Sequence, residues 1–331
     1  MSNKKTKTNF SIPNDKIGLI IALIILIAIF TLLNHNYFGY TNMIDILLAA
    51  CLTGLVAIGE SYLIIAGLVD LSAGSVAAFA SVLTAVLLYK GVNLTITIII
   101  VLGAGTLVGF VNGFAYNKIK LEPFIATLAT MSIVRGFAYI ICGGNDVYIT
   151  NNELIAFGTD RLLGIPYSVI ILIIAFIVFG IILAKTRFGR SIYVIGGNKE
   201  AARLAGLNPQ RISSILFMIS GALAALGGII LAAEMNSGEP ASSVGLEFYA
   251  ITAAILGGIA FTGGVGTILG TLIGVLILQC FNTGLIMINV PSFWQQVAQG
   301  MLLLIALTFD FLRKQRRDKK LIKENMRTLK S

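Results

Sequence analysis

The chain is dominated by long apolar runs, most of them about as long as a bilayer is thick. A helix needs roughly 20 apolar residues to cross the hydrocarbon core. We divide the 331-residue sequence into ten such runs: 17–33, 43–66, 71–89, 94–116, 123–142, 165–184, 212–233, 248–261, 264–288 and 293–312. Because lipid offers the backbone no hydrogen bonds, each run is expected to be a helix. The sequence predicts an all-α integral membrane protein with about ten transmembrane helices.

The composition supports a membrane domain rather than a soluble one. Apolar residues make up 57% of the chain and charged residues 12%, whereas soluble domains carry about 25% charged residues. Such a chain has too few polar groups to cover its own surface in water, so membrane lipid is its expected surroundings. We predict one transmembrane domain over 17–312, preceded by a basic segment at 1–16 and followed by a basic tail at 313–331.

The basic residues are concentrated in alternate connections between the runs. Segments 1–16, 117–122, 185–211 and 313–331 hold 4, 2, 6 and 9 of the 24 Lys and Arg residues. Lys and Arg in short loops stay on the cytoplasmic side of a membrane. This partition predicts that both termini are cytoplasmic. It also explains the net charge of +9 without a nucleic-acid partner.

Sequence motifs of catalysis are missing. The chain has no G-x-x-x-x-G-K-[ST] loop for nucleotide phosphates, no G-x-S-x-G and no H-E-x-x-H. Its single histidine and three cysteines match no metal or redox spacing. We therefore expect no catalytic residue, metal or cofactor in this chain. If transport is driven by ATP, a separate subunit has to bind the nucleotide.

One polar segment, 185–211, interrupts the apolar sequence: "KTRFGRSIYVIGGNKEAARLAGLNPQR". Asn198 is a good N-cap, Glu200 suits the first turn, and Gly206 suits the position after the last turn. These signals predict a two-turn helix facing water, which would be unstable alone. It is either a docking site for a partner or a connector that packs on its own protein.

Several polar side chains are candidates for the translocation path or its gate. Glu60 lies deepest in a predicted span, where ionisable groups are costly; it either lines the path or bonds to a neighbouring helix. Asp70 and Ser72 are predicted at a cytoplasmic turn, where they cap the next helix, shape a gate or contact the substrate. Arg135 lies inside a span, where it either pairs with an acidic group or extends to the membrane surface, and its partner is open.

Glycines cluster near the C-terminal end of the apolar region. They are Gly257, Gly258, Gly263, Gly264, Gly266, Gly270 and Gly274. Small residues at intervals of four let helix backbones approach closely. The cluster predicts either static helix packing or a surface that slides around the pore, and the first four glycines are gate candidates.

The motif "EAARLAG" at 200–206 resembles the E-A-A-x-x-x-G segment of permease subunits in ATP-binding-cassette (ABC) importers. In that family the segment is the coupling helix, which docks in a groove of the ATPase subunit. The resemblance implies an ATPase-coupling site made of Arg190, Gly197, Asn198, Glu200, Ala201, Ala202, Leu204 and Gly206.

Four segments in the family's order resemble the monosaccharide permeases of this class. They are "LIIAGLVDLSAGSVAAF" from 63, "PFIATLATMSIVRG" from 123, "TRFGRSIYVIGGNKEAARLAG" from 186 and "AAILGGIAFTGGVGTILGTLIGVLIL" from 253. The resemblance implies a subunit of a ribose, xylose, arabinose or galactose importer in a bacterial plasma membrane. It implies three partners: a cytoplasmic ABC ATPase, an extracytoplasmic sugar-binding protein and a second permease chain, identical or closely related.

Other functions remain open on the sequence. A stand-alone secondary transporter driven by an ion gradient would need paired carboxylates at broken helices inside the membrane, and Glu60 is one candidate. ABC permeases for nucleosides or branched-chain amino acids share the architecture. The branched-chain relatives usually carry Asn in place of the aspartate at Asp70, which favours a sugar.

Overall fold

The computed structural model describes residues 14–328 as a bundle of helices. Most of the predicted segment 1–16 and the last three residues of the predicted tail lie outside the described residues. The helices are α1 (Asn14–Leu33), α2 (Tyr40–Ile65), α3 (Ala73–Tyr89), α4 (Leu94–Phe114), α5 (Pro123–Cys142), α6 (Asn152–Thr159), α7 (Tyr167–Lys185), α8 (Arg187–Gly197), α9 (Lys199–Leu204), α10 (Pro209–Met235), α11 (Leu246–Leu256), α12 (Ile268–Met287) and α13 (Ser292–Thr328). A π-helical turn, η1 (Ala115–Ile119), extends α4.

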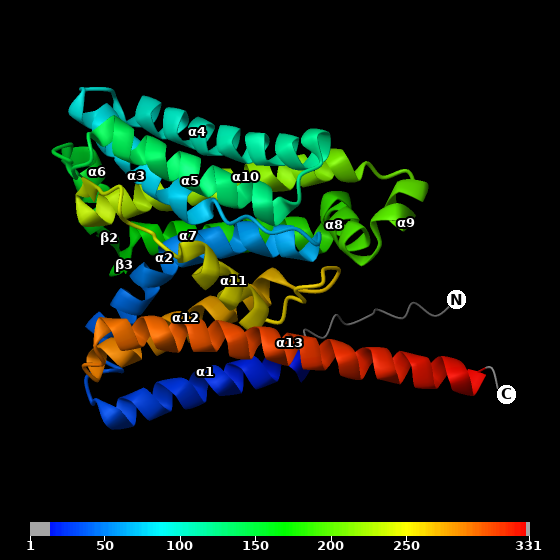
Figure 1. Cartoon of the computed structure of the whole chain (residues 1–331). Helices are drawn as coiled ribbons and strands as arrows, with labels where there is room; N and C mark the ends of the chain where they lie inside the picture. The colour runs from blue at the N-terminus through cyan, green and yellow to red at the C-terminus, as the bar shows by residue number, and fades with distance from the viewer. Residues whose placement is uncertain (1–13, 329–331) are drawn as a thin grey trace, which may run out of the picture.

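The two ends of the bundle differ (Figure 1). Helices α8 and α9 protrude at one end, which we call the arm face; α1 begins and α13 ends on this side. Helix α6 and two small antiparallel pairs occupy the other end, the far face. The pairs are β1 (Val147–Tyr148) with β4 (Ser237–Gly238), and β2 (Arg161–Leu162) with β3 (Ile165–Pro166).

Length and surface confirm an all-α membrane protein. Within residues 14–328, eight helices are long and apolar enough to cross a bilayer. Large apolar side chains on their surfaces point outward; Leu32 and Ile140 are 82% and 72% exposed. Two further apolar helices, α3 and α11, are shorter, with 17 and 11 residues. The predicted ten crossings therefore stay a prediction.

Each short helix adjoins a stretch of non-helical chain. Residues 66–72 between α2 and α3 form the first break, and residues 257–267 between α11 and α12 form the second. The helix before each break ends alike. Gly67 and Gly258 have φ angles of +78° and +89°, and the next amide, of Leu68 or Ile259, donates to the carbonyl five residues earlier. This is the glycine-dependent Schellman ending.

A third non-helical stretch, the far-face loop (residues 236–245), leads into the bundle from the opposite side. Figure 1 shows it running inward from the far face to the start of α11. The first turns of α3 and α11 touch there, because a Cβ on Gly74 would overlap the Glu247 carboxylate and the Ser243 carbonyl. Two discontinuous helices thus start beside each other inside the protein.

Glycines hold the central helices close together. A Cβ on Gly105 or Gly109 of α4 would overlap backbone carbonyls of α10, so these two helices pack backbone to backbone. Gly270 and Gly274 of α12 face α11 in the same way, as the predicted packing role requires. Gly266 does not belong to this face, contrary to the predicted helix from 264. With φ of +154° it lies in the second break, because α12 begins only at Ile268.

Candidate functional site

The short helix predicted in the polar segment is present as α9. The Asn198 side chain accepts a hydrogen bond from the Ala201 amide at 2.9 Å, and Glu200 lies in the first turn. Gly206 ends the helix with φ of +81°. Ala202 is fully buried while Leu204 is 89% exposed. Helix α9 therefore rests on its own protein by one side and presents an apolar side chain outward with the other.

A second helix, α8, precedes α9 and was not predicted. The Thr186 hydroxyl caps it by accepting from the Gly189 amide at 3.1 Å. Ile192 and Ile195 are buried against the bundle, whereas Arg190 is exposed. We call α8 and α9 together the polar arm. The predicted coupling residues therefore lie on two helices: Arg190 and Gly197 are on α8, and the other six lie in α9 or directly beside its ends.

The end of α8 is seated on both breaks. The Gly264 amide of the second break donates to the Ile65 carbonyl, where the first break begins, at 2.8 Å. A Cβ on Gly196 of α8 would overlap that carbonyl and approach the Gly264 nitrogen at 2.7 Å. Gly197, next in the chain, has nothing within 4 Å of its Cβ position. Of these two glycines, Gly196 is the one with no room for a Cβ at this contact between α8 and the two breaks, which we call the joint.

Tyr193 forms a side-chain link at the same joint. Its hydroxyl donates to the Gly266 carbonyl of the second break at 2.8 Å. Burial raises the pKa of the Tyr193 phenol, so the phenol is a neutral donor at pH 7. Any shift of α8 has to move the second break or break this bond.

Asp70 is buried, which corrects its predicted place at a cytoplasmic turn. Its side chain is 1% exposed. The carboxylate accepts from the Ser72 amide and hydroxyl at 2.9 and 2.6 Å and from the Ser220 hydroxyl of α10 at 3.1 Å. The first break lies inside the bundle. The sequence showed that Asp70 and Ser72 are polar, but not that other helices surround them. Asp70 holds the chain just before α3 in place.

Ser72 belongs to the same buried network. Asn112 of α4 donates to the Ser72 hydroxyl at 2.9 Å. The Leu71 amide donates to the Thr127 hydroxyl of α5 at 3.1 Å. Ser72 precedes α3, but its hydroxyl does not cap that helix. The network therefore attaches the first break to α4, α5 and α10.

Three carboxyl groups are buried around the two helix starts. Glu60, Asp70 and Glu247 are 0%, 1% and 4% exposed. The Asp70 amide points at one Glu60 oxygen at a long 3.4 Å, and the other Glu60 oxygen has no partner. The predicted alternative, a bond from Glu60 to a Ser or Thr of a neighbouring helix, is not made; lining of the path by Glu60 stays a prediction. In residues 14–328 no group of three or more His, Cys, Asp or Glu side chains is arranged to hold a metal ion.

Arg135 binds backbone carbonyls. One guanidinium nitrogen donates to the Pro240 and Ser242 carbonyls at 2.7 and 2.6 Å. Both belong to the far-face loop, so Arg135 tethers this loop to α5. The partner that the sequence left open is therefore main chain.

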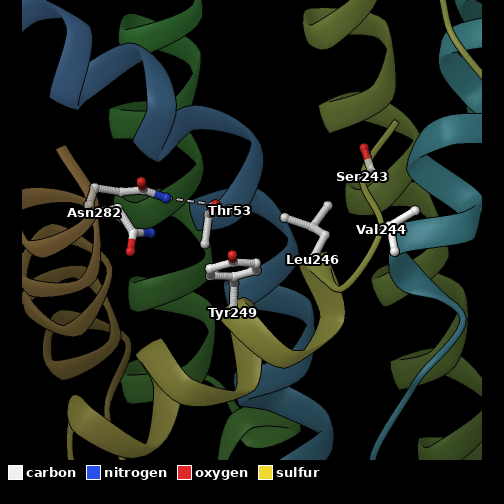
Figure 2. A pocket seen from close by; sticks show the side chains of 7 residues that line it. Thr53, Ser243, Val244, Leu246, Tyr249 and Asn282 are labelled. Carbon is white, nitrogen blue, oxygen red and sulfur yellow. Dashed lines mark hydrogen bonds between the residues drawn. The ribbon is translucent and has the colours of Figure 1, made fainter. Parts of the chain in front are cut away.

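A polar pocket of about 210 Å³ lies beside this loop (Figure 2). Its lining residues are Thr53, Ser243, Val244, Leu246, Tyr249, Gln279 and Asn282. Gln279 of α12 donates to the Thr53 hydroxyl of α2 at 2.8 Å. Figure 2 shows Thr53, Tyr249 and Asn282 gathered between α2, α11 and α12. Hydroxyl, amide and aromatic groups are what a small neutral polar ligand requires.

The sequence did not single out the pocket residues. Gln279 and Asn282 lie in the apolar run "LIGVLILQCFNTG", and an uncharged amide inside a span is itself a signal of function or helix contact. Thr53 and Tyr249 carry no such signal, because both are common in membrane helices. Only the packing of α2, α11 and α12 brings the four together.

Comparisons with known proteins define the class. A model of the family described as "Branched-chain amino acid transport system / permease component" matches residues 42–307. The chain therefore belongs to this permease family. It is 37% identical over 312 residues to the ribose import permease protein RbsC of Bacillus subtilis, covering 94% of this chain and 97% of the relative.

A second relative is also named as a sugar permease, whereas the family description names branched-chain amino acids. The chain is 39% identical over 310 residues to the L-arabinose transport system permease protein AraH of Escherichia coli, covering 92% of this chain and 93% of the relative. No solved structure matches significantly. The chain is a monosaccharide ABC permease, a multi-pass protein of the bacterial plasma membrane. The resemblance seen in the sequence motifs is confirmed.

Proposed function

We propose that this chain is the membrane subunit of an ATP-driven importer of a pentose such as ribose. In this proposal the arm face is cytoplasmic, as the distribution of basic residues favours. An ABC ATPase docks on α9, and a sugar-binding protein delivers its cargo at the far face. The observation that carries the proposal is the capped, outward-facing helix α9, whose neighbour α8 is seated on both breaks.

The polar arm gives the ATPase a mechanical connection to the membrane interior. Movement of α9 is passed to α8, since Asn198 joins the two helices with no linker. From α8 it reaches the second break through Tyr193 and the first break through Gly196. Because the breaks lead to α3 and α12, arm movement rearranges helices on either side of the bundle.

The polar pocket is the proposed passage for the sugar. Thr53, Gln279 and Asn282 offer donors and acceptors for sugar hydroxyls, and the Tyr249 ring offers an apolar face. Val244 on the rim is 74% exposed, so the passage is open on one side. A second permease chain, identical or closely related, would close that side and supply the other half.

An ion-coupled secondary transporter is the second candidate, and one observation favours it. Glu60, Asp70 and Glu247 are buried carboxyl groups beside discontinuous helices, an arrangement used for ion sites in such transporters. The family match and α9 favour the ABC reading. Radiolabelled ribose uptake into whole cells separates the two. Uptake that survives a protonophore together with a sodium ionophore while ATP is maintained supports the ABC importer, and uptake lost under those conditions supports ion coupling.

The partner proposal is tested by recovery from the native host in mild detergent, with co-purifying proteins identified by mass spectrometry. We expect wild type to bring down an ABC ATPase, and Glu200→Lys with Ala201→Asp to lose it. Glu153→Lys, a charge reversal in the first turn of far-face helix α6, is the matched control. Equal ATPase recovery by all three proteins would contradict docking at α9.

The cargo is tested separately. The sugar-binding protein that co-purifies, or that is encoded beside this chain, is denatured and its released ligand is identified by mass spectrometry. A pentose supports the proposal. A nucleoside or a branched-chain amino acid would replace the pentose with one of the other substrates that the family architecture allows, without changing the role of α9.

A further inference from the structure

We infer that a long apolar groove beside α7 is a binding site for an anionic phospholipid of the arm-face leaflet. The groove encloses about 670 Å³ between α2, α7 and α12. Apart from its arm-face end, the groove is lined by Leu, Ile, Val, Phe, Ala and Gly residues, none of which has a polar side chain. Such a lining suits hydrocarbon and gives a sugar nothing to bond.

The groove has the length of an acyl chain. It runs along α7 from Val169 to Lys185, a rise of about 24 Å in an α-helix. One leaflet contributes only about 15 Å of hydrocarbon depth. A lipid with its headgroup at the arm face can therefore lay a whole acyl chain in the groove.

One wall of the groove consists of side chains buried in the protein, and the rim of the groove is exposed toward the bilayer. Leu172, Phe176 and Leu183 are 3%, 6% and 2% exposed and form the buried wall, whereas Ile177 is 56% exposed at the rim. Gly180 keeps the space open, because its Cβ position has no neighbour closer than Ile268 at 3.7 Å. A larger side chain at Gly180 would enter the groove without striking the backbone.

Charge selects the lipid. Lys16 at the start of α1 and Lys185 at the end of α7 line the arm-face end, and none of the described side chains that line the groove is acidic. Basic pockets between membrane helices bind anionic headgroups, with about 1 kcal/mol contributed by each lysine near the surface. Two lysines at one end of an apolar groove match phosphatidylglycerol better than a zwitterionic lipid.

The arm-face end of the groove adjoins the contact between α8 and the second break. Tyr193 and Thr267 line the same end of the groove, and Tyr193 bonds to the second break at Gly266. A lipid headgroup held here touches the arm where α8 meets that break. Binding of the lipid therefore stabilises the seated position of the arm.

The test is lipid binding to the purified protein, measured by native mass spectrometry during titration with phosphatidylglycerol or phosphatidylcholine. We expect wild type to prefer phosphatidylglycerol. Lys16→Gln with Lys185→Gln should weaken that lipid on the order of 25-fold, and Lys90→Gln at the opposite face should not. Gly180→Leu should abolish retention, whereas Gly103→Leu, whose Cβ position is also open, should leave it intact.

Two results would overturn the proposal. One is equal binding of phosphatidylglycerol by wild type, the lysine double variant and Gly180→Leu. If Gly180→Leu does not fold, the lysine variant decides alone, since its side chains are at the surface end of the groove. The other is efficient disulfide-linked dimerisation of Ile177→Cys in native membranes, which would assign the groove to a second copy of the chain.

Discussion

The Gly264 amide donates a hydrogen bond to the Ile65 carbonyl at 2.8 Å, and this bond joins the two breaks. Residues 65 and 264 are far apart in the sequence, and they meet here through their main chains. The last turn of α8 lies against that point at Gly196. The polar arm, the first break and the second break are therefore one mechanical unit.

Replacement of Gly196 tests the joint. In Gly196→Ala the new methyl group would overlap the Ile65 carbonyl, and overpacking of this kind costs about 1–3 kcal/mol. We expect α8 to be displaced and sugar uptake to fall at least several-fold with the protein still inserted. Gly197→Ala is the matched control, because its Cβ position is free. Equal uptake by both variants would show that the close contact has no role in transport.

The buried carboxylate of Asp70 gives a second prediction. In Asp70→Asn an NH₂ group replaces one of the two oxygens that accept from Ser72 and Ser220, and a buried donor left without its acceptor costs about 1–3 kcal/mol. We expect a lower unfolding temperature of the purified protein and reduced uptake. Asp146→Asn, at an exposed far-face position, should change neither. An unaltered unfolding temperature for Asp70→Asn would mean that the first break is not held by this side chain.

The pocket pair of Thr53 and Gln279 lends itself to a double-mutant cycle. Thr53→Val and Gln279→Leu each leave one buried partner of their 2.8 Å bond unsatisfied, at about 1–3 kcal/mol. The double variant should be destabilised by less than the sum of the two, since neither partner remains. Stability is read from thermal unfolding.

The same three variants test the pocket as a sugar passage. Each should transport ribose more slowly than wild type, because the passage loses hydroxyl or amide groups. Gln295→Leu removes an amide that bonds to the Val290 carbonyl and is absent from the pocket lining. If it slows uptake as much as Gln279→Leu does, the pocket has no special part in the passage.

Arg135 is predicted to keep the far-face loop ordered. Arg135→Lys retains the charge, but its side chain is one bond shorter, so its nitrogen falls short of the position from which one guanidinium nitrogen reaches both the Pro240 and Ser242 carbonyls. Hydrogen–deuterium exchange of residues 236–246 should become faster in this variant. Arg161→Lys, on an exposed far-face strand, should leave that exchange unchanged. Unchanged exchange in Arg135→Lys would place the tether of the loop elsewhere.

Much of the fold could be predicted from sequence because the signals for it are local. Helix α9 was located because Asn198 and Gly206 are caps whose effect does not depend on the rest of the fold. Long apolar runs revealed the membrane helices for a similar reason. Helix α8 was missed, because "RFGRSIYVIGG" contains three glycines, which disfavour a helix, and the burial of Ile192 and Ile195 against the bundle is not visible in the sequence.

The features that escaped prediction depend on contacts between distant segments. Asp70 looked like a turn residue because polarity between two apolar runs suggests a surface, and only Ser220 and Asn112 of other helices make it a buried anchor. The glycines at 263 and 264 were predicted as gate candidates, which stays a prediction. Their contact with Ile65 and Gly196 could not be read from a linear pattern, since helix spacing does not say which helices are neighbours.

ATP-driven ribose uptake by proteoliposomes containing the chain and its ATPase tests coupling through α9 most directly. Binding protein and ribose are supplied outside and ATP is enclosed within. Wild type should accumulate ribose only with ATP, and Glu200→Lys with Ala201→Asp should be inactive although inserted in equal amount. Uptake by this variant at the wild-type rate, or wild-type uptake driven by an ion gradient without the ATPase, would contradict coupling through the polar arm.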